Sequence, residues 1–235
     1  MVYAAVVFDF FGTLTPDTPS HSWDAHAARS ARPLGIQSTI WRAALDSSFT
    51  ERATGALGDL PQTLRTLARR CGVEPDEKML ASACAARMDA QQELFVLRED
   101  ALPMLRQLRA RGLRVGVLSD CTIELVQAWP SLPLTGLVEV AVFSCSEGWR
   151  KPDPVLFQTA AQRLGVETRE CLYIGDGGGR ELTGASSCNM TAVMLRTAAW
   201  ADNDARREED GWRGPSIESL STVLRLVEGI ESPLT

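Results

Sequence analysis

The sequence predicts an α/β protein in which helices cover both faces of a parallel sheet and a small all-helical domain interrupts the chain near its start. Two observations carry this prediction. From residue 98 onward, short apolar runs alternate with helix-like segments. This alternation favours a parallel sheet, because each crossover between parallel strands needs a long connection that is usually a helix. Between residues 16 and 97 the chain is rich in alanine and arginine and shows no convincing strand pattern.

The first predicted strand is the apolar run YAAVVF at residues 3–8. Four helix-like segments follow it, separated by the turn-forming sequences RPLG, GALGDLP and CGVEPDE. We expect these segments to form a separate small domain or lid, because they lie between the first strand and the rest of the sheet. The predicted boundaries assign residues 1–15 and 98–235 to the α/β core and residues 16–97 to a helical cap.

The rest of the predicted core alternates helices with buried strands. Apolar residues at helical spacing mark the helices, and two of these helices end at a glycine, Gly112 and Gly165. One helix begins at Asp153, an N-cap residue followed by Pro154. The helix-like segments span residues 101–112, 153–165, 180–188 and 217–229, and the strands span residues 113–120, 171–175 and 191–196. We expect the charged segment at residues 201–214 to be a solvated loop.

The composition is that of an ordinary globular protein. At 235 residues, with 45% hydrophobic and 23% charged residues, the chain can bury a sizeable core in one large domain or in a domain and a smaller one. Its net charge of −6 provides no general basic surface, so we expect neither nucleic acid nor a membrane surface as a partner. Of the 24 lysines and arginines only two are lysines, Lys78 and Lys151.

The chain shows no pattern typical of a targeting segment or a zinc site. The apolar run at residues 2–8 is too short to cross a bilayer, and no basic segment precedes it as a secretory signal requires. We therefore expect a cytoplasmic location. The six cysteines include no Cys-x-x-Cys pair, and the two histidines are His21 and His26. Neither a zinc site nor a disulfide framework is indicated.

Polar residues stand where three of the predicted strands end. They are Asp9, Ser119 with Asp120, and Asp176. In an open parallel sheet, functional groups collect beyond the carboxyl ends of the strands, so we expect these side chains to meet in space. We expect Lys151, in the segment GWRKPDP, to be their positive partner, because a compact ammonium can approach one oxygen where a broad guanidinium would not fit.

Four short motifs carry a family resemblance: DFFGT at residues 9–13, VLSD at 117–120, RKPDP at 150–154 and GDGGGRE at 175–181. In this order and context they resemble the four motifs of the haloacid dehalogenase superfamily of hydrolases, and the match covers the whole core. The helical stretch between the first two motifs is similar to the mobile cap that many members insert there. The resemblance implies a Rossmann-like core and a hydrolase, first of all a phosphatase acting on a small phosphorylated metabolite.

The resemblance also implies roles for residues of these motifs. Asp9 would be the nucleophile that attacks phosphorus and forms an aspartyl-phosphate, which water then hydrolyses. Lys151 would neutralise the nucleophile and the phosphoryl oxygens. Thr13, Ser119 and Asp120 would bind the phosphate or the rest of the substrate.

The same motifs imply a divalent cation. Asp9, Asp176 and Glu181 would place three carboxylates in one pocket, which is costly unless a cation is present. Mg²⁺ suits such a set of oxygen ligands, which the backbone carbonyl of Phe11 and water would complete. The sequence leaves open whether Glu181 binds the ion directly or through water.

Two features allow other interpretations. The segment GDGGGRE also fits a phosphate-cradling glycine loop between a strand and a helix. It fails as a dinucleotide-binding fingerprint, because Arg180 occupies the position of the third glycine. Arg42 in the helical insert could contact an anionic substrate, although a solvated helix face is the better interpretation.

Phe11 departs from the pattern of the phosphatases in the resembled superfamily. Those enzymes usually carry a second aspartate two residues after the nucleophile, which protonates the leaving alcohol and later activates water. An alkoxide leaves poorly without a proton, and general acid catalysis typically contributes about 10²- to 10⁴-fold. We therefore expect phosphomonoesters of ordinary alcohols to be poor substrates. The backbone carbonyl that the metal would use is retained.

Three hypotheses follow. The first is a Mg²⁺-dependent phosphatase for substrates with a good leaving group, or one that takes its acid from the lid or the substrate. The second is a 2-haloacid dehalogenase, because halide leaves without protonation and members with that activity also lack the second aspartate, although they need no cation. The third is a binding or regulatory protein with little turnover. The sequence names neither the substrate nor the oligomeric state, and a homodimer stays an option.

Overall fold

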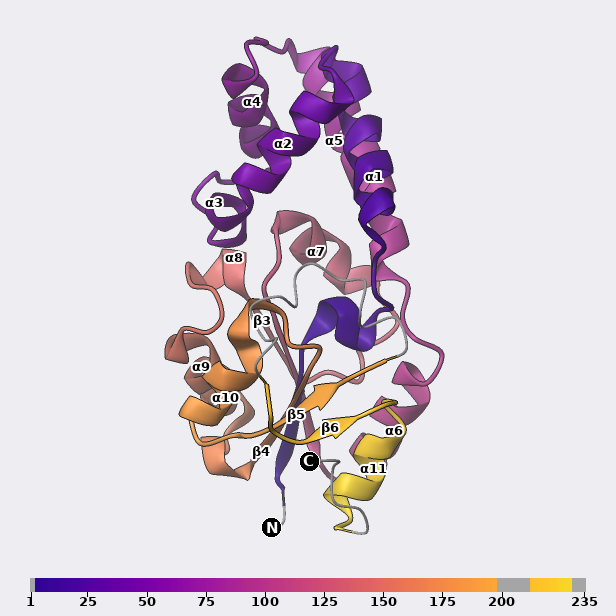
Figure 1. Cartoon of the computed structure of the whole chain (residues 1–235), viewed down its shortest axis with the longest axis vertical. Coiled ribbons are helices and arrows are strands. Elements are labelled where there is room, and N and C mark those ends of the chain that lie inside the picture. Colours follow the sequence, from indigo (N-terminus) through magenta and orange to yellow (C-terminus); the bar gives the residue numbers. More distant parts are fainter. Residues whose placement is uncertain (1–2, 198–211, 230–235) are drawn as a thin grey trace.

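The computed structural model describes residues 3–197 and 212–229. Its centre is a six-stranded sheet in the order β3-β2-β1-β4-β5-β6, and every pair of neighbouring strands in it is parallel (Figure 1). The strands are β1 Ala5–Phe8, β2 Arg114–Ser119, β3 Val140–Phe143, β4 Cys171–Gly175, β5 Thr191–Leu195 and β6 Ser216–Ile217. The predicted α/β fold class is confirmed.

β1 lies in the middle of the sheet. It pairs with β2 on one side and with β4 on the other, so that Phe8 is aligned with both Val117 and Ile174. All four residues of β1 are buried, as expected for a parallel strand that is covered on both faces. The residues that follow β1, β2 and β4 therefore come together at one edge of the sheet.

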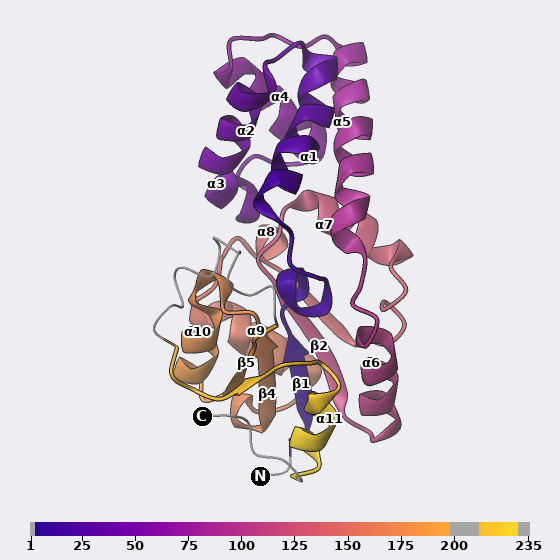
Figure 2. The ribbon, with the colours of Figure 1, turned by 45° about the vertical axis from the view of Figure 1, so that its right-hand side comes forward.

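Helices cover both faces of the sheet (Figures 1 and 2). Side chains alternate across β1, so Val6 and Phe8 contribute to one apolar cluster and Ala5 and Val7 to another. The first cluster includes residues of α6 and α11, and the second includes residues of α9 and α10. The helices of the core are α6 Ala101–Ala110, α7 Ile123–Ala128, α8 Ser144–Glu147, α9 Pro154–Leu164, α10 Glu181–Ser187 and α11 Thr222–Val227. Short helical turns are η1 Phe10–Leu14, η3 Trp129–Ser131, η4 Thr168–Glu170 and η5 Gly178–Arg180.

The remaining helices form a body beyond the carboxyl end of β1, which we call the helical unit (Figures 1 and 2). Its members are α1 Ser20–Leu34, α2 Ser38–Ser47, α3 Phe49–Ala53, α4 Leu60–Arg70, α5 Glu77–Gln92 and η2 Glu93–Phe95. The buried residues of α1, α2, α4 and α5 form an apolar cluster of their own, in which Trp41 and Leu67 are fully buried. Leu94 and Phe95 of η2 instead join the core cluster. The domain boundaries at residues 15/16 and 97/98 stay a prediction.

Some elements differ from those predicted. The second helix-like segment of the insert is two helices, because α2 ends at Ser47 and α3 begins at Phe49. The sequence analysis missed β3 and β6, which have four and two residues and are too short to show a clear pattern. The predicted helix at residues 217–229 begins only at Thr222, since Ile217 belongs to β6. The predicted loop at residues 201–214 lies mainly outside the described residues. No helix within residues 3–197 and 212–229 has the length and apolar character needed to cross a membrane.

Candidate active site

Asp9 stands directly after β1, at the edge of the sheet that faces the helical unit. Its backbone is still extended, and its N–H donates to the carbonyl of Ile174 at 2.9 Å. The chain then turns at Gly12, whose φ of +79° is a conformation that favours glycine. A Cβ at Gly12 would lie 2.1 Å from Oδ2 of Asp176, so only glycine lets the backbone approach this carboxylate. The turn after β1 thus positions Asp9 beside Asp176.

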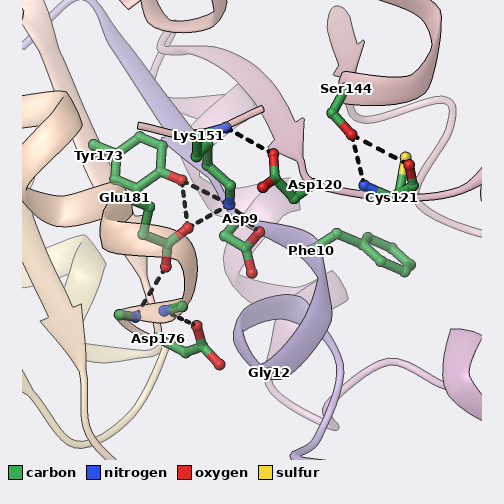
Figure 3. A network of polar contacts seen from close by, with 12 residues as sticks. Asp9, Phe10, Gly12, Asp120, Cys121, Ser144, Lys151, Tyr173, Asp176 and Glu181 are labelled. Carbon is green, nitrogen blue, oxygen red and sulfur yellow. Dashed lines mark hydrogen bonds and ion pairs between the residues drawn. The ribbon is translucent and has the colours of Figure 1, made fainter. Parts of the chain in front are cut away.

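Lys151 provides the ammonium that faces Asp9. Its Nζ lies 2.6 Å from Oδ1 of Asp9 and also donates to the carboxylate of Glu181. The hydroxyl of Tyr173 lies 3.3 Å from the same Nζ and donates to Glu181 at 2.7 Å. Figure 3 shows the ammonium between the two carboxylates and the tyrosine ring. The predicted pairing of Asp9 with Lys151 is therefore present, although the roles assigned to the two residues stay predictions.

The charges at this site are unbalanced. Burial raises the pKa of the Asp9 carboxyl well above its usual value, and Lys151 offsets this only in part. The charges of Glu181 and Asp176 add to the rise. Burial by itself lowers the pKa of Lys151, but the two carboxylates that it contacts outweigh burial and hold its pKa well above the usual value. One charged lysine thus faces three carboxyl groups.

Asp9, Asp176 and Glu181 form a cluster that fits a divalent cation. Each offers one oxygen, and these oxygens all lie within 4.8 Å of one another. Oδ1 of Asp176 accepts from the N–H of Gly178, and Oε1 of Glu181 accepts from the N–H of Gly177, both at 2.9 Å. Such buried carboxylates are costly without a counter-charge, and an all-oxygen set is the kind that Mg²⁺ prefers.

Thr13 and Ser119 hold two buried hydroxyl groups without a protein partner. Both side chains are fully buried, and neither hydroxyl has a hydrogen-bond partner in the described part of the chain. Ser119 ends β2, and Thr13 lies in η1 after Asp9. Buried polar groups are rarely left unpaired, so these hydroxyls are candidates to bind a ligand.

Asp120 holds the loop that carries Lys151. Its Oδ1 accepts from the N–H of Lys151 at 2.9 Å, and its Oδ2 accepts from Nε of Arg150 at 3.1 Å. Because both oxygens accept hydrogen bonds from this loop, Asp120 helps to hold Lys151 in its position. The predicted contact of Asp120 with a substrate stays a prediction.

Phe11 offers a ring at the position of the expected acid. The ring is 5.0 Å from that of Phe10 in an edge-on arrangement and 6.3 Å from that of Phe95. Phe11 is half-buried and packs against the core cluster. Its side chain can supply no proton.

A cavity of about 510 Å³ lies between the carboxyl edge of the sheet and the helical unit. Its volume falls within the range of about 300 to 1,000 Å³ that is typical of small-molecule sites. From the core it is lined by Asp9, Phe11, Asp120, Lys151, Asp176 and Glu181. From the helical unit it is lined by Arg42, Leu45, Phe49, Arg52, Arg87 and Gln91, among others. Thr13 and Ser119 do not line it.

The lining residues of the helical unit were missed by the sequence analysis, apart from Arg42. Arg42 does reach the cavity wall, but its guanidinium is paired with Asp46 at 2.8 Å and with Asp24 at 3.1 Å. Tyr173 was also missed, because a tyrosine inside a buried strand looks like any core residue. No local pattern marks these positions, since their meeting with Asp9 depends on how the helical unit packs on the core.

Arg98 is a further residue that the sequence analysis did not single out. Its Nε donates to the carbonyl of Thr13 at 2.9 Å, and one terminal nitrogen donates to the carbonyl of Gly12, also at 2.9 Å. These bonds fix the peptide groups of the turn that follows Asp9. Arg98 is therefore a positioning residue for this turn.

Fold and site together define an α/β protein with a buried cluster of carboxylates and a lysine at the carboxyl edge of its sheet. The family model of the haloacid dehalogenase-like hydrolases matches residues 3–189. The chain therefore belongs to this family and is a hydrolase, as its motifs predicted.

Individual relatives include phosphatases and dehalogenases. A protein of Methanopyrus kandleri named glyceraldehyde 3-phosphate phosphatase is 29% identical over 210 residues, which cover 88% of this chain and 89% of that protein. The structure of a 2-haloacid dehalogenase from Pseudomonas syringae pv. Tomato DC3000 matches with a TM-score of 0.70 at 19% identity, covering 97% of this chain and 99% of that one. A HAD phosphatase from Thermococcus onnurineus matches with a TM-score of 0.60 at 22% identity, covering 98% and 99%. At these identities the two structures show a shared fold.

Proposed function

We propose that the chain is a Mg²⁺-dependent phosphatase that acts on a small phosphorylated metabolite and lacks the usual acid/base aspartate. The observation that carries this proposal is the cluster of Asp9, Asp176 and Glu181, two of which, Asp9 and Glu181, also contact Lys151. A dehalogenase of this family needs no cation, whereas the pair of Asp176 and Glu181 beside Asp9 suggests one. The name of the Methanopyrus kandleri relative supports phosphatase chemistry.

In the proposed reaction Asp9 attacks phosphorus, and the P–O bond to the leaving group breaks. The aspartyl-phosphate is then hydrolysed by water, which returns the Asp9 carboxylate and releases phosphate. Lys151 holds the attacking oxygen and offsets negative charge as it develops. Thr13 and Ser119 would donate to the transferring group, which requires their buried hydroxyls to become accessible from the cavity.

The residues that would hold Mg²⁺ are Asp9, Asp176, Glu181 and the backbone carbonyl of Phe11. When bound, the ion would supply the positive charge that this acidic pocket and a phosphoryl group both require. Glu181 already accepts hydrogen bonds from Lys151, Tyr173 and the N–H of Gly177. We therefore propose that Glu181 would contribute negative charge to the metal site while it keeps Lys151 and Tyr173 in place.

The ring of Phe11 restricts the leaving group. Without a proton donor at this position, a leaving oxygen must be stable as an anion or must receive its proton from the substrate. Acyl and aryl phosphates meet this condition, whereas alkyl phosphates should react more slowly by about 10²- to 10⁴-fold. The name of the Methanopyrus kandleri relative makes glyceraldehyde 3-phosphate the first alkyl phosphate to include in a panel.

The test is phosphate release from a panel of acyl, aryl and alkyl phosphates, with and without Mg²⁺. We expect Mg²⁺-dependent release from the acyl and aryl phosphates that is lost in Asp9→Asn. Halide release from 2-haloacids without metal would instead establish a dehalogenase. No turnover of any ester or haloacid would favour a binding or regulatory protein.

We propose that the helical unit serves as the cap that selects the substrate, since it supplies one wall of the cavity. A cytoplasmic location, the lack of nucleic-acid partners and the option of a homodimer stay predictions. Sedimentation velocity would determine the oligomeric state.

A further inference from the structure

Two buried arginines stand on the wall that the helical unit gives to the cavity. Arg52 is 8% exposed and Arg87 is 6% exposed, and both line the cavity. Nε of Arg87 donates to Glu124 at 2.7 Å, which makes a buried ion pair between α5 and α7. Arg52 donates to the carbonyl of Leu45 and to the hydroxyl of Ser48. It forms no ion pair with any residue that the structure describes.

These buried side chains carry one more positive than negative charge. Burial lowers the pKa of Arg52 to about 10, and the charge of Arg87 adds to this effect. Burial raises the pKa of Glu124, but the two arginines outweigh it and bring the pKa to about 2. Arg52 and Glu124 are therefore both charged at neutral pH. A buried net positive charge is costly unless an anion compensates it.

The nearby surface carboxylates do not supply this compensation. Asp46 also acts on Arg52, but its side chain is 59% exposed and is paired with Arg42 at 2.8 Å. Asp24, the second partner of Arg42, is 74% exposed. Solvent screens charges at such positions strongly. The cavity wall formed by Arg52 and Arg87 therefore keeps an excess of one positive charge.

Gln91 adds an unpaired donor to the same wall. Its side chain is 4% exposed, and its Nε2 has no hydrogen-bond partner among the described residues. Gln91 follows Arg87 by one turn of α5, so the two side chains share a face of the helix. Both also line the cavity. A buried amide normally finds a partner, so this donor is available to a ligand.

We propose that Arg52, Arg87 and Gln91 bind a carboxylate of the substrate, at the end remote from the phosphate that Asp9 attacks. The inference rests on the proposed phosphatase function and narrows its substrate class to small phosphorylated carboxylic acids. A carboxylate fits better than a second phosphate, because its single charge matches the excess of one positive charge. Its two coplanar oxygens also match the planar donors of a guanidinium group.

A neutral end group would not fit this wall. An aldehyde offers one weak acceptor and no charge, so it would leave the arginines uncompensated. Glyceraldehyde 3-phosphate and 3-phosphoglycerate differ only in an aldehyde against a carboxylate, which makes them a matched pair for the test. Both have alkyl leaving groups, so the lack of an acid at Phe11 affects them equally.

The first experiment measures kcat/KM for both compounds in the wild-type protein with Mg²⁺. We expect kcat/KM to be higher for 3-phosphoglycerate by about tenfold or more, because one charge-assisted hydrogen bond contributes a factor of about this size. Release of nitrophenol from p-nitrophenyl phosphate, which carries no carboxylate, reports phosphatase activity separately. Turnover of p-nitrophenyl phosphate with no preference between the paired compounds would overturn this inference and leave the proposed function standing.

Variants show whether these residues cause the preference. Gln91→Leu removes the amide and leaves the Arg87–Glu124 ion pair intact, and we expect it to lower the ratio of the two kcat/KM values several-fold. Arg52→Met should lower the ratio further, and Arg52→Lys should restore part of it. The control is Arg65→Gln, because Arg65 lies in the same unit, pairs with Glu77 and does not line the cavity. A loss of stability alone would lower both kcat/KM values and leave their ratio unchanged.

Binding measurements test the inference even if no phosphate ester is turned over. 2-Carboxyethylphosphonate and 3-methylbutylphosphonate have the same shape and differ in that two methyl groups replace the two carboxylate oxygens, and neither can be hydrolysed. By calorimetry with Mg²⁺ we expect the carboxylate compound to bind about tenfold more tightly, and Gln91→Leu to reduce the difference. Equal affinities would contradict the inference independently of any result on catalysis.

Discussion

Phe11 determines which leaving groups the proposed reaction can accept. Its ring packs against Phe10 and Phe95, so the position is part of the apolar support for the turn after Asp9. The same ring lines the cavity beside Asp9. With an acid at this position the protein would gain a proton donor for catalysis. It would also lose the ring packing that holds the turn.

Phe11→Asp should raise kcat/KM for alkyl phosphates by about tenfold or more, with a smaller gain for p-nitrophenyl phosphate, because only the poor leaving groups need a proton. We expect a loss of stability on the order of 1–3 kcal/mol from the lost ring, measured by urea unfolding. Phe11→Asn is the matched control, since it loses the same ring and gains no acid. Equal activities of the two variants on alkyl phosphates would contradict the prediction.

Among the elements, the turn that follows β1 does most to place the carboxylates. Gly12 has a φ of +79°, and the space that a Cβ would need is occupied by the carboxylate of Asp176. Arg98 reaches this turn from the segment before α6 and holds the carbonyls of Gly12 and Thr13. Strand, turn and arginine together fix the distance between Asp9 and Asp176.

Gly12→Ala should abolish the proposed Mg²⁺-dependent activity, because the new Cβ would lie 2.1 Å from Oδ2 of Asp176 and displace this carboxylate. The control is Gly112→Ala, whose glycine has a nearly equal φ of +78° but no heavy atom within 4 Å of the added Cβ. Both variants carry the strain of a positive φ, on the order of 1 kcal/mol. Phosphate release measured against Mg²⁺ concentration separates them, and similar losses in both would show that backbone strain alone is responsible.

The elements also show why the sequence predicted part of the site. Asp9, Ser119 and Asp176 each follow a buried parallel strand, and parallel strands end at a common edge, so a local pattern is enough to bring these residues together. No local pattern of this kind marks Arg52 and Arg87. They lie on helices whose alanine- and arginine-rich sequence looks the same on the cavity side and on the solvent side. Their place at the cavity follows from the packing of the helical unit on the core, which is a tertiary property.

The inner strands of the sheet could be predicted from the sequence, whereas the strands at its edges could not. β1, β2, β4 and β5 were predicted because each is a continuous apolar run, as fully buried strands require. β3 lies next to β2 at one edge of the sheet, and only two of its four residues are buried. β6 contributes two residues at the other edge. Edge strands of this length carry too little burial to be visible in sequence.

At the scale of the whole molecule, the helical unit and the core are joined by buried and polar contacts around the cavity. Arg87 of α5 pairs with Glu124 of α7. Arg150, next to Lys151, donates to Thr50 at 3.0 Å and lies 4.7 Å from the centre of the Phe49 ring. The position of the helical unit is thus linked directly to the loop that carries the lysine.

The Arg87–Glu124 pair should make stability depend on acid pH. The pKa of Glu124 is about 2 in the folded protein against an ordinary value of 4.5. A lowered carboxyl pKa contributes stability that is complete above pH 4.5 and is lost as pH falls toward 2. Between pH 6 and pH 3 this amounts to about 2 kcal/mol, at 1.36 kcal/mol for each unit of pKa difference.

Urea unfolding of wild type and Glu124→Gln at pH 6 and pH 3 measures this contribution. We expect the variant to be less stable at pH 6 by about 3–5 kcal/mol, because Arg87 is left buried without its partner, and the gap to narrow at pH 3. The control is Glu77→Gln, which breaks the pair with Arg65 at a position that is 86% exposed. A gap that stays constant between the two pH values would show that Glu124 does not titrate as inferred.

The helical unit also lies close to the core at Gly55, which follows α3 and faces the backbone of Cys145 in α8. A Cβ at Gly55 would lie 2.2 Å from the backbone carbonyl of Cys145, which cannot move aside as a flexible side chain would. Gly55→Ala should therefore hold the helical unit away from the core and weaken the contacts of Arg150 with Thr50 and Phe49. Because the cavity wall and the loop that carries Lys151 then separate, we expect kcat/KM to fall by about tenfold or more, mainly through a higher KM. We also expect the radius of gyration in solution scattering to increase.

Gly72→Ala is the matched control in the same helical unit. Gly72 has a φ of +81° and no heavy atom within 4 Å of the added Cβ, so this variant carries the backbone strain without the obstruction. If both variants lower kcat/KM equally and neither expands, contact at Gly55 does not control closure.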